Sequence, residues 1–169
     1  MLHNDVLRSV RYMLDVDDES IAQLIALGGG NTRPTEVMAY LLRDDEPGYE
    51  ICSDRVMGQF LDGLILHRRG PREGAKGGLS SRSAKAPMAV TNNAILKALR
   101  IAFELKEDDL LAMMKAAGFE VSRPELSALF RNPAHHNYRP CGDQFLRNFL
   151  KGLTAYVKSA RASGRARPG

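Results

Sequence analysis

The chain has 169 residues, of which 44% are hydrophobic and 26% charged, so we expect a soluble globular protein of one ordinary domain or two small ones. No apolar run approaches the ~20 residues that span a bilayer, and the first ten residues lack the apolar core of a secretory signal. We therefore predict a cytoplasmic protein with no membrane segment. Its two cysteines are too few for a disulfide scaffold.

The formal net charge is +4, but the basic excess is unevenly distributed. Residues 1–66 hold 5 basic and 12 acidic side chains, whereas residues 67–89 hold 6 basic and 1 acidic. Residues 90–157 are nearly balanced, and residues 158–169 hold 4 basic side chains and no acidic one. A polyanion-binding surface on a folded domain needs its basic groups clustered on that domain. The acidic first part of the chain does not meet this condition.

The first predicted helix occurs twice, at an offset of 89 residues. NDVLRSVRYMLDV at 4–16 aligns with NAILKALRIAFEL at 93–105. In both segments the apolar residues recur at spacings of three and four, as on one face of a helix. Asn4 and Asn93 stand where N-caps belong, and asparagine is a preferred capping residue. We therefore expect both asparagines to cap.

The second and third predicted helices are also duplicated. DDESIAQLIALGG aligns with EDDLLAMMKAAGF, each with acids at its start and glycine near its end, where a left-handed residue stops a helix. TRPTEVMAYLLR aligns with SRPELSALFR, in which Ser122 and Glu125 have capping-box spacing and Pro124 lies in the first turn. We expect gaps of one residue in this part of the alignment.

The fourth predicted helix repeats as CSDRVMGQFLDGL at 52–64 and CGDQFLRNFLKGL at 141–153. With Ser53 and Gly142 as N-caps, an aspartate falls in each first turn, where the helix dipole favours it. Each cysteine then precedes a cap and packs as a hydrophobic staple on the residue five places later. The marks of this structural repeat are Cys52, Asp54, Phe60, Cys141, Asp143 and Phe149.

These patterns predict an all-α protein, a tandem duplication of a small four-helix unit packed with approximate two-fold pseudo-symmetry. A lone unit of about 65 residues buries little core, so the copies should pack together or dimerise. We assign 1–66 and 91–157 to the helical repeats and 67–90 to a basic Gly/Ser/Pro-rich linker. Residues 158–169 should form a basic flexible tail.

Five motifs carry a resemblance to a known family. They are NDVLRSVRYML, LGGG, CSDRVMGQFLDGLILHRRG, NNAILKALRIAFELKEDDLLAM and CGDQFLRNFLKGL, which are spread over most of the length from position 2 to position 157. In them the chain closely resembles the YehS-like family of bacterial proteins, built from a tandem helical domain of unknown function. The resemblance implies the duplicated fold and brings no catalytic residue, ligand or substrate. The linker and tail look longer and more basic than in that family.

Two nucleic-acid hypotheses follow from the helices and the basic segments. The second and third helices of each copy have a helix-turn-helix outline, with Arg33, Thr35 and Glu36, or Arg123 and Glu125, starting a recognition helix. Helices joined by short turns also occur in any small helical bundle, and helix capping alone explains Ser122, Pro124 and Glu125. The basic segments predict salt-sensitive polyanion contact, or only a solubilising role. The candidate contact residues are Arg68, Arg69, Arg72, Lys76, Arg82, Lys85, Arg123, Lys158, Arg161, Arg165 and Arg167.

Catalytic and metal sites are poorly supported by the sequence. His135, His136 and Cys141 suggest metal ligands, but the set lacks a paired Cys-x-x-Cys. A thiol at a helix start can have a lowered pKa, yet no repeated histidine stands beside either cysteine in sequence. We therefore predict no enzyme, metal or cofactor, and a binding or adaptor module whose partner is an unknown protein or a second copy. The alternative is a nucleic-acid-associated regulator.

Overall fold

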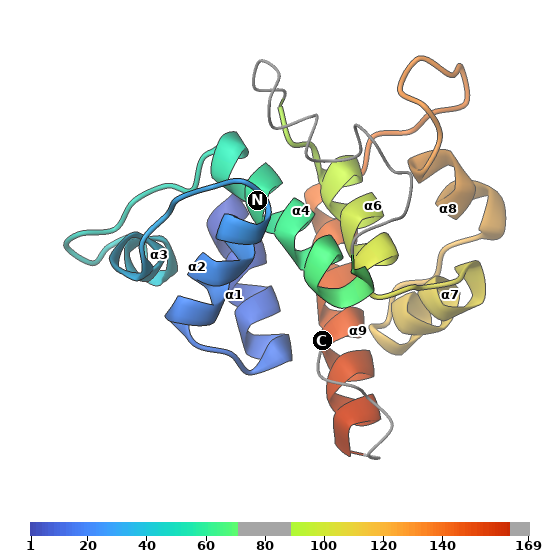
Figure 1. Cartoon of the computed structure of the whole chain (residues 1–169). Coiled ribbons are helices and arrows are strands. Elements are labelled where there is room, and N and C mark those ends of the chain that lie inside the picture. Colours follow the sequence, from blue (N-terminus) through green and yellow to red (C-terminus); the bar gives the residue numbers. More distant parts are fainter. Residues whose placement is uncertain (71–88, 163–169) are drawn as a thin grey trace. The chain divides into compact units, whose positions relative to one another are not determined.

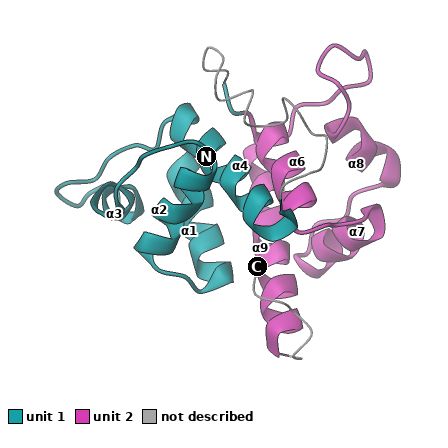
Figure 2. Cartoon of the chain, viewed as in Figure 1, with its two compact units in different colours: residues 1–90, 169 teal, residues 91–168 magenta. Residues whose placement is uncertain are grey.

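The computed structural model describes residues 1–70 and 89–162, and these residues form eight α-helices and no strand (Figure 1). The chain divides into two compact units, residues 1–90 and 91–168 (Figure 2). Each unit contains four helices, as the duplicated pattern predicts. No helix in the described part of the chain is long and apolar enough to cross a membrane.

The first unit consists of α1 (His3–Leu14), α2 (Asp18–Leu27), α3 (Pro34–Leu41) and α4 (Asp54–Arg69). Helix α2 packs against α3 and α4, and α1 contacts the same two helices. The side chains at three- and four-residue spacings are those that become buried, because they share one face of each helix. The core includes Val6, Leu7, Val10, Met13, Ile21, Ile25, Val37, Met57, Phe60 and Leu64.

The second unit repeats this order with α6 (Asn92–Ala102), α7 (Glu107–Ala116), α8 (Arg123–Leu129) and α9 (Asp143–Ala162). Helix α9 packs against α6 and α7. The core residues again follow the apolar face predicted for each helix. They include Ile95, Leu96, Leu99, Leu110, Met114, Leu126, Leu146, Phe149, Leu150 and Leu153.

Several helix ends are formed as their sequences predict. The Ser53 hydroxyl caps α4 by accepting a hydrogen bond from the backbone N–H of Val56 at 3.2 Å. Ser122 and Glu125 form a reciprocal capping box at the start of α8, with distances of 3.2 and 3.1 Å. Gly29 and Gly118 follow α2 and α7 with φ of 96° and 83°, a conformation that glycine adopts without strain.

The N-cap prediction for Asn4 and Asn93 is wrong. The N-cap of α1 is Leu2, and that of α6 is Thr91, whose hydroxyl accepts from the N–H of Ala94 at 3.1 Å. Both asparagines lie inside the first helical turn. Their side chains are used for distant backbone groups instead of for their own helix ends.

The repeat keeps one register without the expected gaps. The N–H of Glu46 donates to the Arg43 carbonyl at 3.0 Å, and the N–H of His135 donates to the Asn132 carbonyl at 2.8 Å. The donor and the acceptor of the second bond are each 89 positions after those of the first. In addition, α4 continues through Arg69 and α9 through Ala162, so the first residues of the expected linker and tail are helical.

Glycine allows close helix packing at one equivalent position in each unit. A Cβ atom at Gly63 of α4 would overlap the carbonyl oxygen of Leu24 in α2, and one at Gly28 would overlap the carbonyl oxygen of Gln59. A Cβ at Gly152 of α9 would stand 2.6 Å from the carbonyl oxygen of Met113 in α7. The backbones of α2 and α4 therefore approach each other more closely than those of α7 and α9.

Candidate functional site

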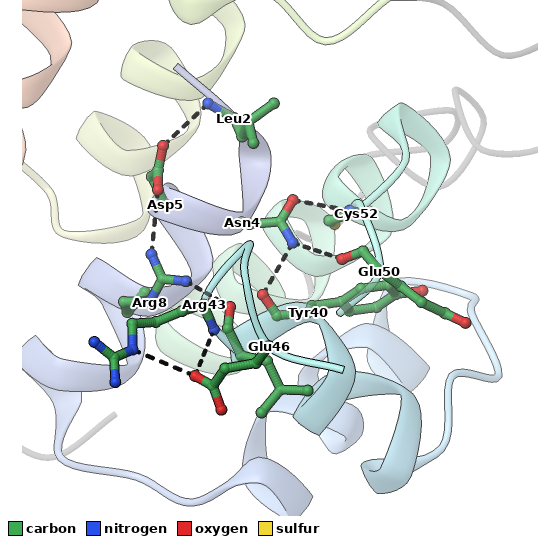
Figure 3. A network of polar contacts seen from close by, with 10 residues as sticks. Leu2, Asn4, Asp5, Arg8, Tyr40, Arg43, Glu46, Glu50 and Cys52 are labelled. Carbon is green, nitrogen blue, oxygen red and sulfur yellow. Dashed lines mark hydrogen bonds and ion pairs between the residues drawn. The ribbon is translucent and has the colours of Figure 1, made fainter. Parts of the chain in front are cut away.

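A buried asparagine joins α1 to the segment between α3 and α4 (Figure 3). The Asn4 side chain is 1% exposed, and its Nδ2 atom donates to the carbonyl oxygens of Tyr40 and Glu50 at 2.9 and 2.8 Å. Its Oδ1 atom accepts a hydrogen bond from the N–H of Cys52 at 2.9 Å. One amide thus satisfies three backbone groups that no helix satisfies, which is why it is retained in an apolar core.

The second unit contains the same arrangement at Asn93. Its Nδ2 atom donates to the carbonyl oxygens of Leu129 and Arg139 at 3.0 and 2.9 Å, and its Oδ1 atom accepts from the N–H of Cys141 at 2.8 Å. All four residues are offset by 89 from their counterparts. We call each arrangement an asparagine latch.

Each latch holds both ends of one exposed connection. We define the first loop as residues 42–51 and the second loop as residues 131–140. A backbone hydrogen bond reinforces each latch, from the N–H of Glu50 to the Ala39 carbonyl at 3.2 Å and from the N–H of Arg139 to the Ala128 carbonyl at 3.1 Å. Two tight turns within each loop complete the structure. The loops therefore have a defined conformation on a rigid support.

The two loops have opposite charge despite their common geometry. The first loop holds four acidic residues and one arginine, and that arginine, Arg43, pairs with Glu46 at 3.4 Å. The second loop holds two arginines, two histidines and no acidic residue. The rings of His135 and His136 stack with centroids 4.7 Å apart and planes 16° from parallel. The latched scaffold is thus shared, and the surface that it presents is different in each unit.

The cysteines lie at the inner end of each loop and are buried free thiols. Burial, followed by the nearby Asp54 carboxylate, raises the pKa of Cys52 to about 12. Burial and Asp143 raise the pKa of Cys141 to about 11. A raised pKa lowers the fraction of thiolate at neutral pH, which is the reactive form of cysteine. Both thiols are buried two residues before a helix begins, as the predicted hydrophobic staple requires.

A polar pair joins the starts of the first and fourth helices in each unit. His3 Nε2 lies 2.5 Å from Asp54 Oδ1, and in the second unit Asn92 Nδ2 donates to Asp143 Oδ1 at 2.8 Å. A His–Asp pair suggests acid–base chemistry, but an asparagine occupies the equivalent position in the other unit. The common role is structural. Each aspartate lies in the first turn of the fourth helix of its unit and is bonded to a side chain at the start of the first helix.

The predicted nucleic-acid contacts are placed in three ways. Arg68 and Arg69 lie in the last turn of α4, and Lys158 and Arg161 lie near the end of α9. Arg123 is exposed but paired, at 3.0 Å from Glu107 and 2.6 Å from Asp108. Six residues lie outside the described part of the chain, and they are Arg72, Lys76, Arg82, Lys85, Arg165 and Arg167.

Arg33, Glu36 and Glu125, three of the residues proposed to start a recognition helix, are engaged in local contacts. The N–H of Arg33 donates to Glu36 Oε1 at 3.1 Å, and this bond is the largest cause of the lowered pKa of Glu36. Glu125 is held by Ser122, whose hydrogen bonds lower its pKa in the same way. Among residues 1–70 and 89–162, no three His, Cys, Asp or Glu side chains are grouped so that they could hold a metal ion.

Sequence reasoning missed the latches and the contrast between the loops. Asn4 and Asn93 were visible as an aligned pair, but a capping role accounted for both. The sequence pattern around His135 and His136 indicates metal ligands and not a stacked ring pair. The signal that would have revealed the loops was the gap-free alignment at offset 89, which sets Glu46 and Pro47 against His135 and His136.

The structure is a tandem of two small helical units, and both units match one family model. Residues 3–70 and 92–158 match a protein family of unknown function (DUF1456), so the chain belongs to this family and carries its domain twice. The chain is also similar to the uncharacterized protein YehS of Escherichia coli (strain K12). The two are 44% identical over 155 residues, which cover 92% of this chain and 96% of that protein. No solved structure matches the chain.

Proposed function

We propose that the protein is a non-catalytic binding module whose two latched loops are its contact surfaces. The observation that carries this proposal is the repetition of the buried latch beneath loops of opposite charge. Binding residues are often carried on exposed loops that a rigid scaffold holds in position. Several polar residues elsewhere in the repeat have a structural role: the asparagines form latches, Ser53 and Ser122 cap helices, and the thiols are buried.

The charges of the loops indicate two different kinds of contact. The first loop, with Asp44, Asp45, Glu46 and Glu50, suits a basic surface on a partner. The second loop, with arginines and imidazoles, suits an anionic partner. We place this activity in the cytoplasm, a reducing compartment that suits two free cysteines. A second copy of the chain is one candidate partner, because its first loop and its second loop have complementary charges.

The alternative function is a nucleic-acid-associated regulator that uses the basic segments. The observation that favours it is the concentration of positive charge at the helix ends, where Arg68, Arg69, Lys158 and Arg161 lie. The binding would be independent of sequence and would weaken as salt rises. If neutralising these four residues left retention on heparin at low salt unchanged, this alternative would be rejected.

The binding-module proposal can be tested by site-specific photocrosslinking of the full chain in cells. A photoreactive phenylalanine replaces Asp45 in the first loop or His136 in the second. Matched controls carry it at Gln23 on α2 and Ala112 on α7, which are also exposed. We expect discrete adducts from the loop positions and none from the helix positions. Equal adduct patterns at all four positions, or adducts from the helices alone, would contradict the proposal.

A further inference from the structure

The second loop combines positive charge with exposed planar rings. Arg131, His135, His136 and Arg139 are all exposed, and the two imidazole rings are stacked. The side chain of Arg131 makes no ion pair with any residue in the described ranges. A loop that shows both guanidinium groups and stacked rings contains the two elements by which proteins hold unpaired nucleotides: cations for phosphate and flat faces for bases.

The ring pair is held in place before any ligand arrives. The N–H of Asn137 donates to Nδ1 of His135 at 3.0 Å, and the N–H of Ala134 donates to the side chain of Asn132 at 2.9 Å. The Asn93 latch fixes the backbone at Arg139, so the side chain of this arginine extends from a fixed backbone position. A preorganised loop loses less conformational entropy on binding than a flexible one.

We propose that the second loop is a contact site for single-stranded nucleic acid. This inference rests on the proposed function in one respect, since it takes the latched loop as a binding surface. Arg131 and Arg139 would contact phosphates, and the exposed face of the stacked histidines would carry a base. An acidic peptide would satisfy the arginines but not the rings, and a duplex hides its base faces, so unpaired nucleotides fit both features.

The first loop explains why only one such site exists in the described residues. Its equivalent positions place Glu46 and Pro47 where the second loop has the two histidines, and Glu50 where it has Arg139. Four carboxylates on that loop repel phosphate. The same scaffold therefore presents an anion-attracting loop in one unit and an anion-repelling loop in the other.

Fluorescence anisotropy of the full chain with labelled oligo(dT) and oligo(U) tests this site. His136→Ala should weaken binding about tenfold, whereas His136→Phe should retain it, because a benzene ring still stacks on a base. Replacing Arg131 and Arg139 by glutamine should reduce the slope of log affinity against log salt by about 1.4. The control replaces two exposed lysines of the same unit, Lys97 and Lys115, by glutamine, which changes the net charge by the same amount. We expect this control to leave the slope of log affinity against log salt unchanged.

Three results would overturn the site. They are equal affinities for the alanine and phenylalanine variants, equal salt slopes for the arginine and lysine variants, and displacement of the oligonucleotide by polyglutamate at equal charge. The last result would assign the loop to an acidic protein. Crosslinks from position 136 without oligonucleotide binding would refute this inference alone, whereas crosslinks from neither loop would refute the binding-module function as well.

Discussion

The two units share a fold, a register and a latch, but they close their helix pairs in different ways. In the first unit Gly28 and Gly63 bring the backbones of α2 and α4 into contact. In the second unit the equivalent of Gly28 is Ala117, and that of Gly30 is Phe119, which packs edge-on against Phe145 with ring centroids 5.6 Å apart. The second unit keeps a close glycine contact at Gly152 only, and an aromatic pair packs at the position where the first unit has Gly30.

This difference separates what the fold requires from what it tolerates. The asparagine latch occurs in both units with hydrogen bonds of nearly the same length, because three backbone groups must be satisfied in the interior. The distance between packed helices can vary. Glycines let two helices approach closely, and aromatic rings fill the space where the helices lie further apart. The loops differ in charge, since most of their side chains face water.

The largest expected contrast between the units is in cysteine reactivity. Because burial raises the pKa of Cys52 to about 12 and that of Cys141 to about 11 from an ordinary 9.0, alkylation of the native protein at neutral pH should be slowed about a thousandfold and a hundredfold. Mass spectrometry after iodoacetamide treatment measures both rates, with the protein unfolded in guanidinium as the control. Faster labelling of Cys52 than of Cys141 would contradict the contrast.

The same shifts give a direction to the pH dependence of stability. The folded-state pKa of each thiol is raised, so the full stabilisation is present below pH 9.0 and is lost as the pH rises above it. Each thiol should lower the free energy of unfolding by about 1.4 kcal/mol per pH unit in that range. Replacing Cys52 by alanine should remove its share of the slope.

A methyl group at the helix contacts should affect the first unit more strongly. Gly63→Ala should lower the free energy of unfolding by about 3 kcal/mol or more, because the methyl group meets the Leu24 backbone, which cannot move without separating α2 from α4. Gly152→Ala should cost only about 1 kcal/mol, since the overlap is smaller and alanine favours a helix. Urea denaturation measures both.

Gly58→Ala provides the control on α4. A Cβ there would have only an ordinary contact of 3.8 Å with Val90, so this variant should gain up to about 1 kcal/mol from helix propensity. Similar losses at Gly58 and Gly63 would show that backbone contact between α2 and α4 is not what requires glycine.

The latches should differ less than the glycine contacts. Asn4→Ala leaves three backbone groups unpaired in a site that is 1% exposed, and we expect a loss of about 2–3 kcal/mol. Asn93→Ala should cost about 1–2 kcal/mol, because Asn93 is only partly buried and water can reach its partners. Hydrogen exchange at the N–H of Cys52 and Cys141 should accelerate in the matching variant alone.

The exposed Asn31 supplies a matched substitution for the latch variants. Asn31→Ala should change stability by no more than about 0.5 kcal/mol. If Asn4→Ala unfolded with the same free energy as Asn31→Ala, the latch would contribute nothing to the first unit.

The smallest effect on stability is expected at the polar pair in which the first unit has His3 and the second unit has Asn92 at the equivalent position. His3→Asn reproduces the pair of the second unit, in which Asn92 bonds Asp143, so stability should change by less than about 0.5 kcal/mol. His3→Ala should lose about 0.5–1 kcal/mol, because Asp54 then lacks its partner. A thermal melt of each variant separates them, and equal losses would show that the polar pair is irrelevant to stability.

Helix positions and the duplication were predictable because they depend on local pattern. Apolar spacing located the four helices of each unit, and the Ser53 cap and the Ser122 capping box were identified from residues only three positions apart. The ends of α4 and α9 were less well predicted. Basic residues such as Arg69 and Arg161 are compatible both with a final helical turn and with a linker, so composition did not distinguish the two.

The sequence by itself therefore determined an all-helical, duplicated chain, because helix periodicity, caps and internal repetition involve neighbours along the chain. Only the tertiary structure decided the role of Asn4 and Asn93, since their partners lie 36 to 48 residues away. The same holds for the thiols, whose pKa depends on burial by the surrounding helices. It holds too for the loops, because a charged segment becomes a defined surface only when a distant asparagine side chain holds backbone groups at both of its ends.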